Sequence, residues 1–281
     1  MLSDPRRSRL GARGVPGVRR LRNGWRRLRP YPRPQYLKDT PMTGGDEPLD
    51  IFCPPTALTL AEAAMSDEAV SRVIEVLGRL APSKDHDSGQ AFYAYSRNKY
   101  GKYWKHADLP RMLWAAATLL KPKTYLEIGV WRGRSAAIVG SIAPDCAIYG
   151  FDMWISEYHG SPTSDPDFVR QELTRIGHQG PVELITGDSK KTVPEFLREH
   201  PDLFFDIISI DGDKSIVGCG TDFANTLPRL KVGGVVIFDD IPTVPSLDRL
   251  WDDLIRHDHR FVSWDFNDAG FGVAVGLRAF A

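Results

Sequence analysis

The sequence predicts an α/β fold: a doubly wound, mostly parallel seven-stranded sheet with a helical N-terminal extension. From residue 124 onward, apolar strand-like segments alternate regularly with amphipathic helical segments. Residues 235–238 are apolar without alternation, which is typical of a strand covered by helices on both faces. Two closing strands flank residues 267–270, Asn-Asp-Ala-Gly, which favour a hairpin turn.

The elements can be placed in chain order. Strands are expected over residues 125–130, 147–151, 182–186, 205–210, 235–238, 261–266 and 271–275. Helices are expected over residues 134–143, 166–177, 190–200, 215–230 and 246–257. A further helix covers 108–120, with Asp108 as its cap and Pro110 in the first turn. Residues 56–80 repeat apolar positions at three and four, which predicts one or two amphipathic helices with Ser66 or Asp67 as a cap.

Length and charge indicate three segments. The 281 residues suffice for one principal domain with an appendage. We expect a basic, disordered tail over residues 1–40, a helical lid or cap over 41–104, and the principal domain over 105–281. The net charge of zero hides a charge of +11 on residues 1–38 and −11 on the remainder. The acidic body makes nucleic acid an unexpected partner.

The arginine-rich tail allows several interpretations. It holds eleven arginines and little that could be buried, so a solvated tail is expected. Contact with an anionic surface, a targeting peptide, and a true start at Met42 stay open. The longest apolar helical run, residues 112–120, is too short for a membrane span. Three distant cysteines without a C-x-x-C pair suit a reducing compartment, so a cytoplasmic location is expected.

Residues 92–105 interleave six aromatic residues with four cations. This pattern is compatible with a structural or lid role, with contact to a small-molecule substrate through a loop over the active site, or with stacking on nucleic acid. The acidic body disfavours nucleic acid. The helices before this stretch are expected to form a lid or a dimer face, so a homo-oligomer is one expectation.

The chain is organised around residues 124–135, Thr-Tyr-Leu-Glu-Ile-Gly-Val-Trp-Arg-Gly-Arg-Ser. An apolar strand turns into a helix through Gly129 and Gly133, which lets a ligand approach bare backbone. Free N–H groups at the helix start favour an anion. The spacing is Glu-x-Gly-x-x-x-Gly-x-Ser, which differs from the Gly-x-Gly-x-x-Gly of dinucleotide-binding proteins. It resembles motif I of class I S-adenosylmethionine (SAM) dependent methyltransferases, whose Rossmann-like sheet also ends in an antiparallel hairpin.

This resemblance implies a SAM site. Gly129 and Gly133 would form the loop against the cofactor, Glu127 would support it, and Ser135 would meet the methionine carboxylate. Asp152, after the second strand, matches the acid that binds both ribose hydroxyls. The residues expected near the adenine are Met153, Trp154 and the run Gly187, Asp188 and Ser189 after the third strand.

The ends of the fourth and fifth strands predict a metal site. Asp211 follows one strand, and Asp239 and Asp240 follow the next. Because neighbouring strands lie about 5 Å apart, these carboxylates should converge. Their repulsion would be relieved by a divalent cation, and oxygen ligands favour Mg²⁺ over zinc.

The same residues resemble metal-dependent O-methyltransferases, including the catechol, caffeoyl-CoA and macrocin-like sugar enzymes. Asp211, Asp239 and Asp240 fall where those enzymes place their metal ligands. Asp240 follows the sugar-modifying branch, since the catechol type usually has asparagine there. Lys214 stands where the catechol type carries a general base. The motif therefore combines a feature of the sugar-modifying enzymes with one of the catechol type. Asp213 is expected to be a loop acid.

The expected activity is SAM-dependent O-methylation of a small molecule, such as a sugar, catechol or polyphenol of secondary metabolism. Lys214, or Asp211 if the lysine points away, would take the proton, and burial and the metal should lower the pKa of Lys214. A salt bridge from Lys214 to Asp213 is the structural alternative. A nicotinamide-dependent oxidoreductase and a non-catalytic SAM-binding protein are the rival functions. His106, His159 and His178 are expected at the surface.

Overall fold

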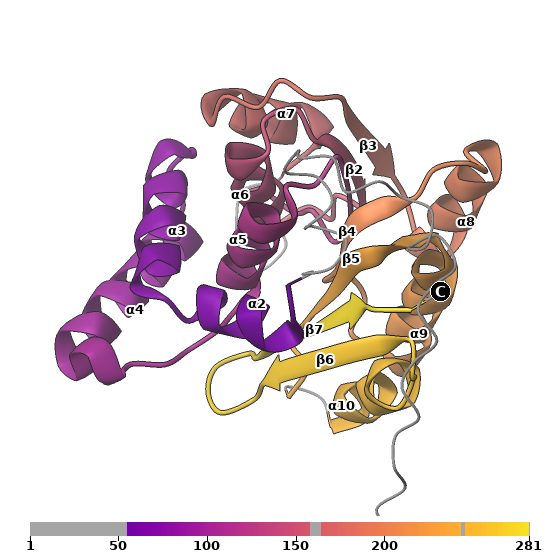
Figure 1. Cartoon of the computed structure of the whole chain (residues 1–281). Coiled ribbons are helices and arrows are strands. Elements are labelled where there is room, and N and C mark those ends of the chain that lie inside the picture. The colour runs from indigo at the N-terminus through magenta and orange to yellow at the C-terminus, as the bar shows by residue number, and fades with distance from the viewer. Residues whose placement is uncertain (1–54, 158–163, 243–244, 281) are drawn as a thin grey trace, which may run out of the picture. The chain divides into compact units, whose positions relative to one another are not determined.

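The sheet has the predicted architecture in the computed structural model, which describes residues 55–157, 164–242 and 245–280 (Figure 1). Its described strands are β1 (Thr124–Ile128), β2 (Ala147–Asp152), β3 (Val182–Thr186), β4 (Phe205–Ile210), β5 (Leu230–Asp239), β6 (Phe261–Phe266) and β7 (Val273–Arg278). The seven strands lie in the order β3-β2-β1-β4-β5-β7-β6. β1 to β5 are parallel, and β7 inserts antiparallel between β5 and β6. The order reverses at β1 and β4, where ligands of open α/β sheets bind beyond the strand ends.

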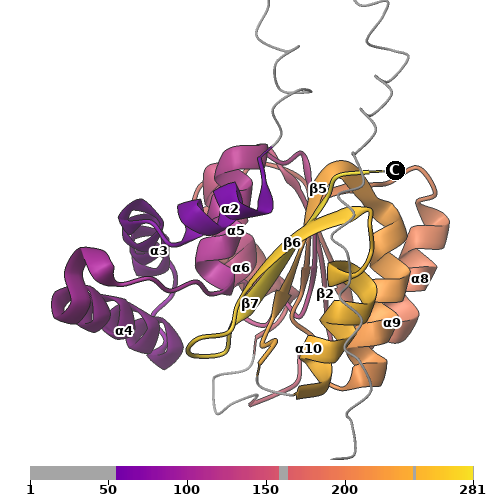
Figure 2. The ribbon, with the colours of Figure 1, turned by 60° about the horizontal axis from the view of Figure 1, so that its bottom comes forward.

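Helices cover both faces of the sheet (Figure 2). One layer holds α2 (Ala57–Ala64), α3 (Asp67–Arg79), α5 (Leu109–Leu120), α6 (Arg134–Ile142) and α7 (Pro166–Arg175). The other holds α8 (Ser189–Glu199), α9 (Ile216–Thr226) and α10 (Pro245–Trp251). In β5, Val235 and Ile237 face the first layer while Val236 and Phe238 face the second, which explains the strand's unbroken apolar run. None of the described helices has the length and apolar character needed to cross a membrane.

Some boundaries differ from the prediction for local reasons. β5 begins at Leu230, five residues earlier than expected, and its pairing with β4 shifts register near Phe205. β7 begins at Val273 because Gly270 and Gly272 both take positive φ and lengthen the hairpin turn. The helix expected over residues 246–257 is an α-helix only as far as Trp251, and its last part is a π-helical turn, η5 (Asp252–Arg256).

The N-terminal extension is helical, as predicted. Ser66 caps α3 by accepting a hydrogen bond from the Ala69 N–H. The aromatic and cationic stretch is mostly helix α4 (Lys84–Tyr100), followed by the 3-10 turn η2 (Gly101–Tyr103), so the loop interpretation of this stretch is wrong. The predicted tail over residues 1–40 and His159 lie outside the described residues.

A buried cluster around Asp108 fastens α4 to the body. Asp108 caps α5 by accepting from the Arg111 N–H at 3.1 Å, and it also accepts from the Tyr93 hydroxyl at 2.7 Å. The Arg111 guanidinium contacts the same carboxylate at 3.2 Å and lies over the Tyr93 and Trp104 rings. His106 stacks on Trp104 and is buried, so its predicted surface position is wrong. Burial opposes ionisation of Asp108, but Arg111 and the hydrogen bonds outweigh it and lower the pKa of the carboxyl.

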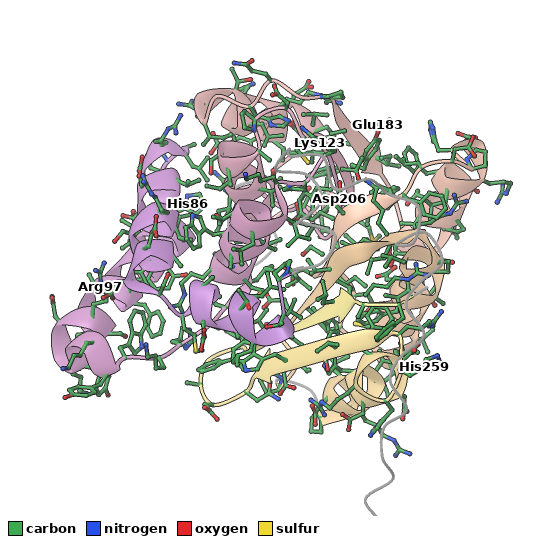
Figure 3. All side chains as sticks on the ribbon, viewed as in Figure 1. His86, Arg97, Lys123, Glu183, Asp206 and His259 are labelled. Atoms are coloured by element: carbon green, nitrogen blue, oxygen red, sulfur yellow. The ribbon has the colours of Figure 1, made fainter. Side chains whose placement is uncertain are left out.

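A second polar junction aligns three strands at their amino ends. Asp206 of β4 accepts hydrogen bonds from the Lys123 and Thr124 N–H groups at 2.8 and 2.9 Å. Lys123 and Asp206 are labelled in Figure 3. The same carboxylate pairs with the Lys231 ammonium of β5 at 2.8 Å. These contacts fix the register of β1, β4 and β5, and therefore the relative heights of their carboxyl ends.

Replacing Asp108 with alanine should lower the free energy of unfolding by about 3–5 kcal/mol, because it leaves the buried Arg111 charge without its partner. Urea denaturation followed by circular dichroism measures the change. The matched control is Asp67→Ala, whose side chain is 72% exposed and only loosely paired with Arg97. Equal stabilities for the two variants would contradict the role of the Asp108 cluster.

Candidate functional site

Three carboxylates meet beyond the ends of β4 and β5. Asp211 directly follows β4, Asp239 ends β5, and Asp240 comes next with φ at +61°. The two strands are in register at Ile210 and Phe238, so they end side by side. Asp211, Asp239 and Asp240 each offer an oxygen within 4.8 Å of the others. The predicted convergence of these side chains is therefore present.

The Lys214 ammonium lies among these carboxylates. Its Nζ is 2.7 Å from Asp211 Oδ1 and 3.2 Å from Asp240 Oδ2, and it donates to the Asp239 backbone carbonyl at 3.3 Å. The predicted alternative, a salt bridge to Asp213, is wrong. Burial alone would lower the pKa of Lys214, but the three carboxylates outweigh it and raise that pKa above its ordinary value. With the protein's own charges alone, the pKa of Lys214 is raised, so the expectation that burial would lower it is also wrong.

The carboxylates suit a divalent cation. Burial raises the pKa of Asp211 despite the opposing charge of Lys214. Burial, together with the charge of Asp211, raises the pKa of Asp239 well above its usual range. Negative charge concentrated in a partly buried place is costly unless a cation compensates it. Carboxylate oxygens are the ligands of a hard ion such as Mg²⁺, which would compete with the Lys214 ammonium for them.

The glycine loop lies directly beside this cluster. Gly129 has φ at +89°, and a Cβ there would lie 2.3 Å from the Asp211 carbonyl oxygen. Gly133 has φ at +74°, and a Cβ there would lie 2.8 Å from a Val169 methyl carbon. Both positions therefore require glycine. The Asp211 N–H also donates to the Ile128 carbonyl at 2.8 Å, which joins the loop to the end of β4.

Glu127 and the start of α6 present complementary charges. Glu127 is fully buried, and neither carboxylate oxygen has a well-aligned hydrogen-bond partner among the described residues. Burial raises the pKa of Glu127 to about 8, although the nearby Ser135 hydroxyl opposes the shift. Gly133 gives α6 no side-chain cap, so the N–H groups of its first turn are open to an anion. An amino acid group, with its ammonium and its carboxylate, suits this arrangement.

Asp152 holds two loops together at the end of β2. Its Oδ2 accepts from the Trp131 N–H and its Oδ1 from the Trp154 N–H, both at 2.7 Å. Each oxygen keeps a second lone pair for a ligand hydroxyl. Trp154 also donates from Nε1 to Thr186 Oγ1 at 3.0 Å, whereas Met153 is 57% exposed. The prediction missed Trp131, whose place between the two glycines was its only signal in the sequence.

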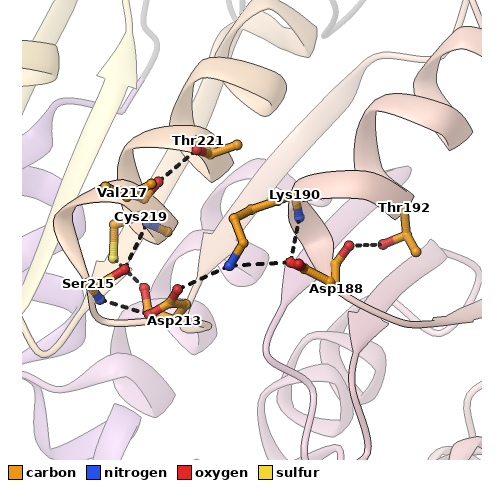
Figure 4. Close-up of polar contacts among 9 residues, drawn as sticks. Asp188, Lys190, Thr192, Asp213, Ser215, Val217, Cys219 and Thr221 are labelled. Carbon is orange, nitrogen blue, oxygen red and sulfur yellow. Dashed lines mark hydrogen bonds and ion pairs between the residues drawn. The ribbon is translucent and has the colours of Figure 1, made fainter.

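The expected adenine segment follows β3. Gly187 has φ at +140° and donates to the Asp152 carbonyl at 2.8 Å. Asp188 caps α8, and Ser189 is the first residue of that helix. The Lys190 ammonium bridges Asp188 and Asp213 at 3.4 and 3.2 Å (Figure 4). Asp213 also accepts from the Ser215 N–H at 2.9 Å, so it is the loop acid that was predicted.

Sequence reasoning also missed Asp222. This residue of α9 is fully buried, and neither carboxylate oxygen has a hydrogen-bond partner among the described residues. Burial raises the pKa of Asp222 to about 6, with the Ser189 hydroxyl opposing the shift. An acid inside a predicted helix carries no local signal of burial, so only the tertiary structure places it behind the site.

Glu127→Gln should stabilise the ligand-free protein at alkaline pH. The pKa of Glu127 is raised from 4.5 to about 8. Between these two pH values the folded protein keeps the Glu127 proton, whereas the unfolded chain has released it. Stability contributed by the protonated group is therefore lost as pH rises toward 8. The variant should exceed the wild type by a few kcal/mol, on the order of 1.4 kcal/mol per pKa unit, above this window and match it below. Unfolding titrations across the window test this, and a gap independent of pH would contradict it.

Comparison with known proteins gives a family match. Residues 126–241 match the family model described as a methyltransferase domain. A comparison with curated protein sequences gives no match. The matched segment runs from β1 to just beyond β5 and so contains the glycine loop, Asp152 and the three converging carboxylates.

Several solved methyltransferase structures are similar to this chain at low sequence identity. The O-methyltransferase TomG from Streptomyces achromogenes, in complex with SAM, is 17% identical with a TM-score of 0.49, over 79% of this chain and 95% of its own. An O-methyltransferase from Bacillus cereus is 17% identical with a TM-score of 0.48, over 75% and 91%. The methyltransferase PaMTH1 of Podospora anserina is 16% identical with a TM-score of 0.47, over 85% and 98%.

The family match falls on the strands and loops that form the candidate site. The strand order and the antiparallel β7 are the class I form of the fold, and the glycine loop differs from that of dinucleotide-binding proteins. Residues 126–241, the segment that holds the candidate site, are therefore similar to a methyltransferase domain.

Proposed function

We propose that this enzyme is a Mg²⁺-dependent O-methyltransferase that acts on a small molecule with two neighbouring oxygens, such as a sugar, catechol or polyphenol. The observation that carries the proposal is the meeting of Asp211, Asp239 and Asp240 beside the glycine loop. A methyl acceptor bound at these carboxylates would lie next to the cofactor. The rival function, a non-catalytic SAM-binding protein, gives no reason for three partly buried carboxylates to converge there.

The cofactor residues would position SAM, which supplies the methyl group on its sulfonium sulfur. The buried Glu127 carboxylate would pair with the methionine ammonium, and the open N–H groups at Ser135 would hold the methionine carboxylate. Asp152 has lone pairs left for both ribose hydroxyls. Met153, Trp154 and the turn at Gly187, Asp188 and Ser189 would surround the adenine.

The acceptor residues would orient and deprotonate a hydroxyl group. Asp211, Asp239 and Asp240 would hold the cation, which supplies Lewis-acid stabilisation of the acceptor oxygen. Lys214 has the only described ammonium within hydrogen-bond distance of this cluster, so its Nζ is the group that would accept the hydroxyl proton. Asp211 is the alternative base. Because the carboxylates raise the pKa of Lys214, its neutral form is favoured by alkaline pH.

Asp239→Asn should abolish high-affinity Mg²⁺ binding and methyl transfer while leaving the affinity for S-adenosylhomocysteine nearly unchanged. The reason is that the substitution removes one of three charged ligands without touching the glycine loop. Isothermal titration calorimetry measures both affinities, and turnover is measured with diols, catechols and glycosides before and after EDTA. Asp248→Asn, on the exposed side of α10, is the control. Full activity after chelation would rule out the metal-dependent mechanism.

Lys214→Met should lower kcat by about a hundredfold or more and change S-adenosylhomocysteine affinity little, because only proton removal is lost. The matched control is Lys191→Met, an exposed lysine at the start of α8. The wild-type kcat should rise with pH, since the neutral amine is required, and the variant should lose this dependence. A kcat within about twofold of wild type would eliminate Lys214 as the base.

A further inference from the structure

Three buried polar residues lie together on the sheet face that the first helix layer covers. Tyr125 and Glu127 are two residues apart on β1, so their side chains project from the same face. Ser209 of β4 is in register with Glu127, and neighbouring strands lie about 4.8 Å apart. All three residues are 0% exposed, and the positions next to Ser209 on this face, Ile207 and Ile237, belong to the apolar core. We call the three residues the Glu127 patch.

The polar atoms of the Glu127 patch are unpaired. The Tyr125 hydroxyl, both Glu127 carboxylate oxygens and the Ser209 hydroxyl are buried, and none has a well-aligned hydrogen-bond partner among the described residues. Each unpaired buried polar atom is costly to the folded state, and apolar side chains would fill this face without that cost. Four such atoms in one place therefore indicate a role in the neighbouring site.

The Glu127 patch lies directly behind the cofactor loop. Glu127 comes two residues before Gly129, at the end of β1 that faces the cofactor. Tyr125 lies about 6.6 Å back along the strand, toward the interior of the sheet, and Ser209 lies beside Glu127. A ligand beyond the strand ends would approach Glu127 from the loop side. The two hydroxyls approach it from the core side.

Both hydroxyls can donate to an ionised Glu127. Burial and the nearby Glu127 carboxyl raise the pKa of Tyr125 well above its usual range, with the Ser209 hydroxyl opposing the shift. Tyr125 therefore keeps its proton at neutral pH, and a serine hydroxyl is a donor throughout. A carboxylate offers about four lone pairs, so Glu127 can accept from both hydroxyls and from an ammonium group as well.

We propose that Tyr125 and Ser209 are positioning residues for the cofactor, whose hydroxyls donate to Glu127 from the core side and hold it ionised toward the methionine ammonium. This assignment rests on the proposed function, which pairs Glu127 with that ammonium. A buried carboxylate stays charged only when donors replace the water it has lost. The ammonium supplies donors on one side of Glu127, and the two hydroxyls supply them on the other.

The test compares S-adenosylhomocysteine with 5′-methylthioadenosine, which lacks the amino acid group. By calorimetry without Mg²⁺, Tyr125→Phe should weaken S-adenosylhomocysteine binding about tenfold or more, as expected for a lost hydrogen bond to a charged group, and 5′-methylthioadenosine binding less than about twofold. Ser209→Ala should give the same pattern. The matched control is Tyr149→Phe, which removes a hydroxyl from the opposite face of β2 and should change neither affinity.

A double-mutant cycle separates positioning from a structural effect. In a Glu127→Gln background, Tyr125→Phe and Ser209→Ala should weaken S-adenosylhomocysteine binding by less than about twofold further, because they act through Glu127. A full, additive loss in that background would overturn the proposal, and so would an equal loss for both ligands. Wild-type affinity for S-adenosylhomocysteine in Tyr125→Phe or in Ser209→Ala would overturn it for that residue.

The same cycle separates this proposal from the proposed function. If Glu127→Gln weakens S-adenosylhomocysteine binding and the two hydroxyl variants do not, only the positioning role fails. If Glu127→Gln itself binds S-adenosylhomocysteine as the wild type does, the pairing of Glu127 with the methionine ammonium fails, and the positioning role fails with it. Neither result depends on the metal or on the methyl acceptor, because both are absent from the measurement.

Discussion

Electrostatic repulsion among three carboxylates is concentrated at one edge of the sheet. Asp211, Asp239 and Asp240 are brought together because β4 and β5 are parallel neighbours that end at the same height. Burial makes their charges costly, and Lys214 compensates only in part. A stable core of apolar strands and two helix layers would not need this cluster. Its presence at the carboxyl edge is the feature on which the proposed methyl acceptor site rests.

The cofactor loop is built around the same edge. Gly129 passes so close to the Asp211 carbonyl that no side chain fits, and this contact holds the cofactor loop and the carboxylate cluster in a fixed relation. Asp152 ties the loop after β1 to the loop after β2 through two backbone N–H groups. The buried Glu127 carboxyl group completes the arrangement. The proposed donor and acceptor sites are thus parts of one connected backbone framework, as in-line methyl transfer between them would need.

Much of the fold and of the candidate site could be predicted from local sequence. Unbroken apolar strands, the spacing of Gly129 and Gly133, and acids placed directly after strands have local physical causes, so the fold and the carboxylate convergence followed from them. Contacts between distant segments had no such signal. The burial of His106 depends on Trp104 and Phe266, and the partners of Lys214 depend on how β4 and β5 end. The buried Asp222 carboxylate, which has no hydrogen-bond partner among the described residues, likewise depends on the tertiary packing around α9.

The most direct test of the central claim is the distance between the cation and the transferred methyl group. Mn²⁺ in place of Mg²⁺ is paramagnetic, so it broadens the NMR signals of nuclei that lie near it. If Asp211, Asp239 and Asp240 hold the cation beside the cofactor, one equivalent of Mn²⁺ should strongly broaden the signal of ¹³C-methyl-labelled SAM bound to the enzyme. A sharp methyl signal, or equal broadening after all three aspartates are replaced by asparagine, would contradict the account.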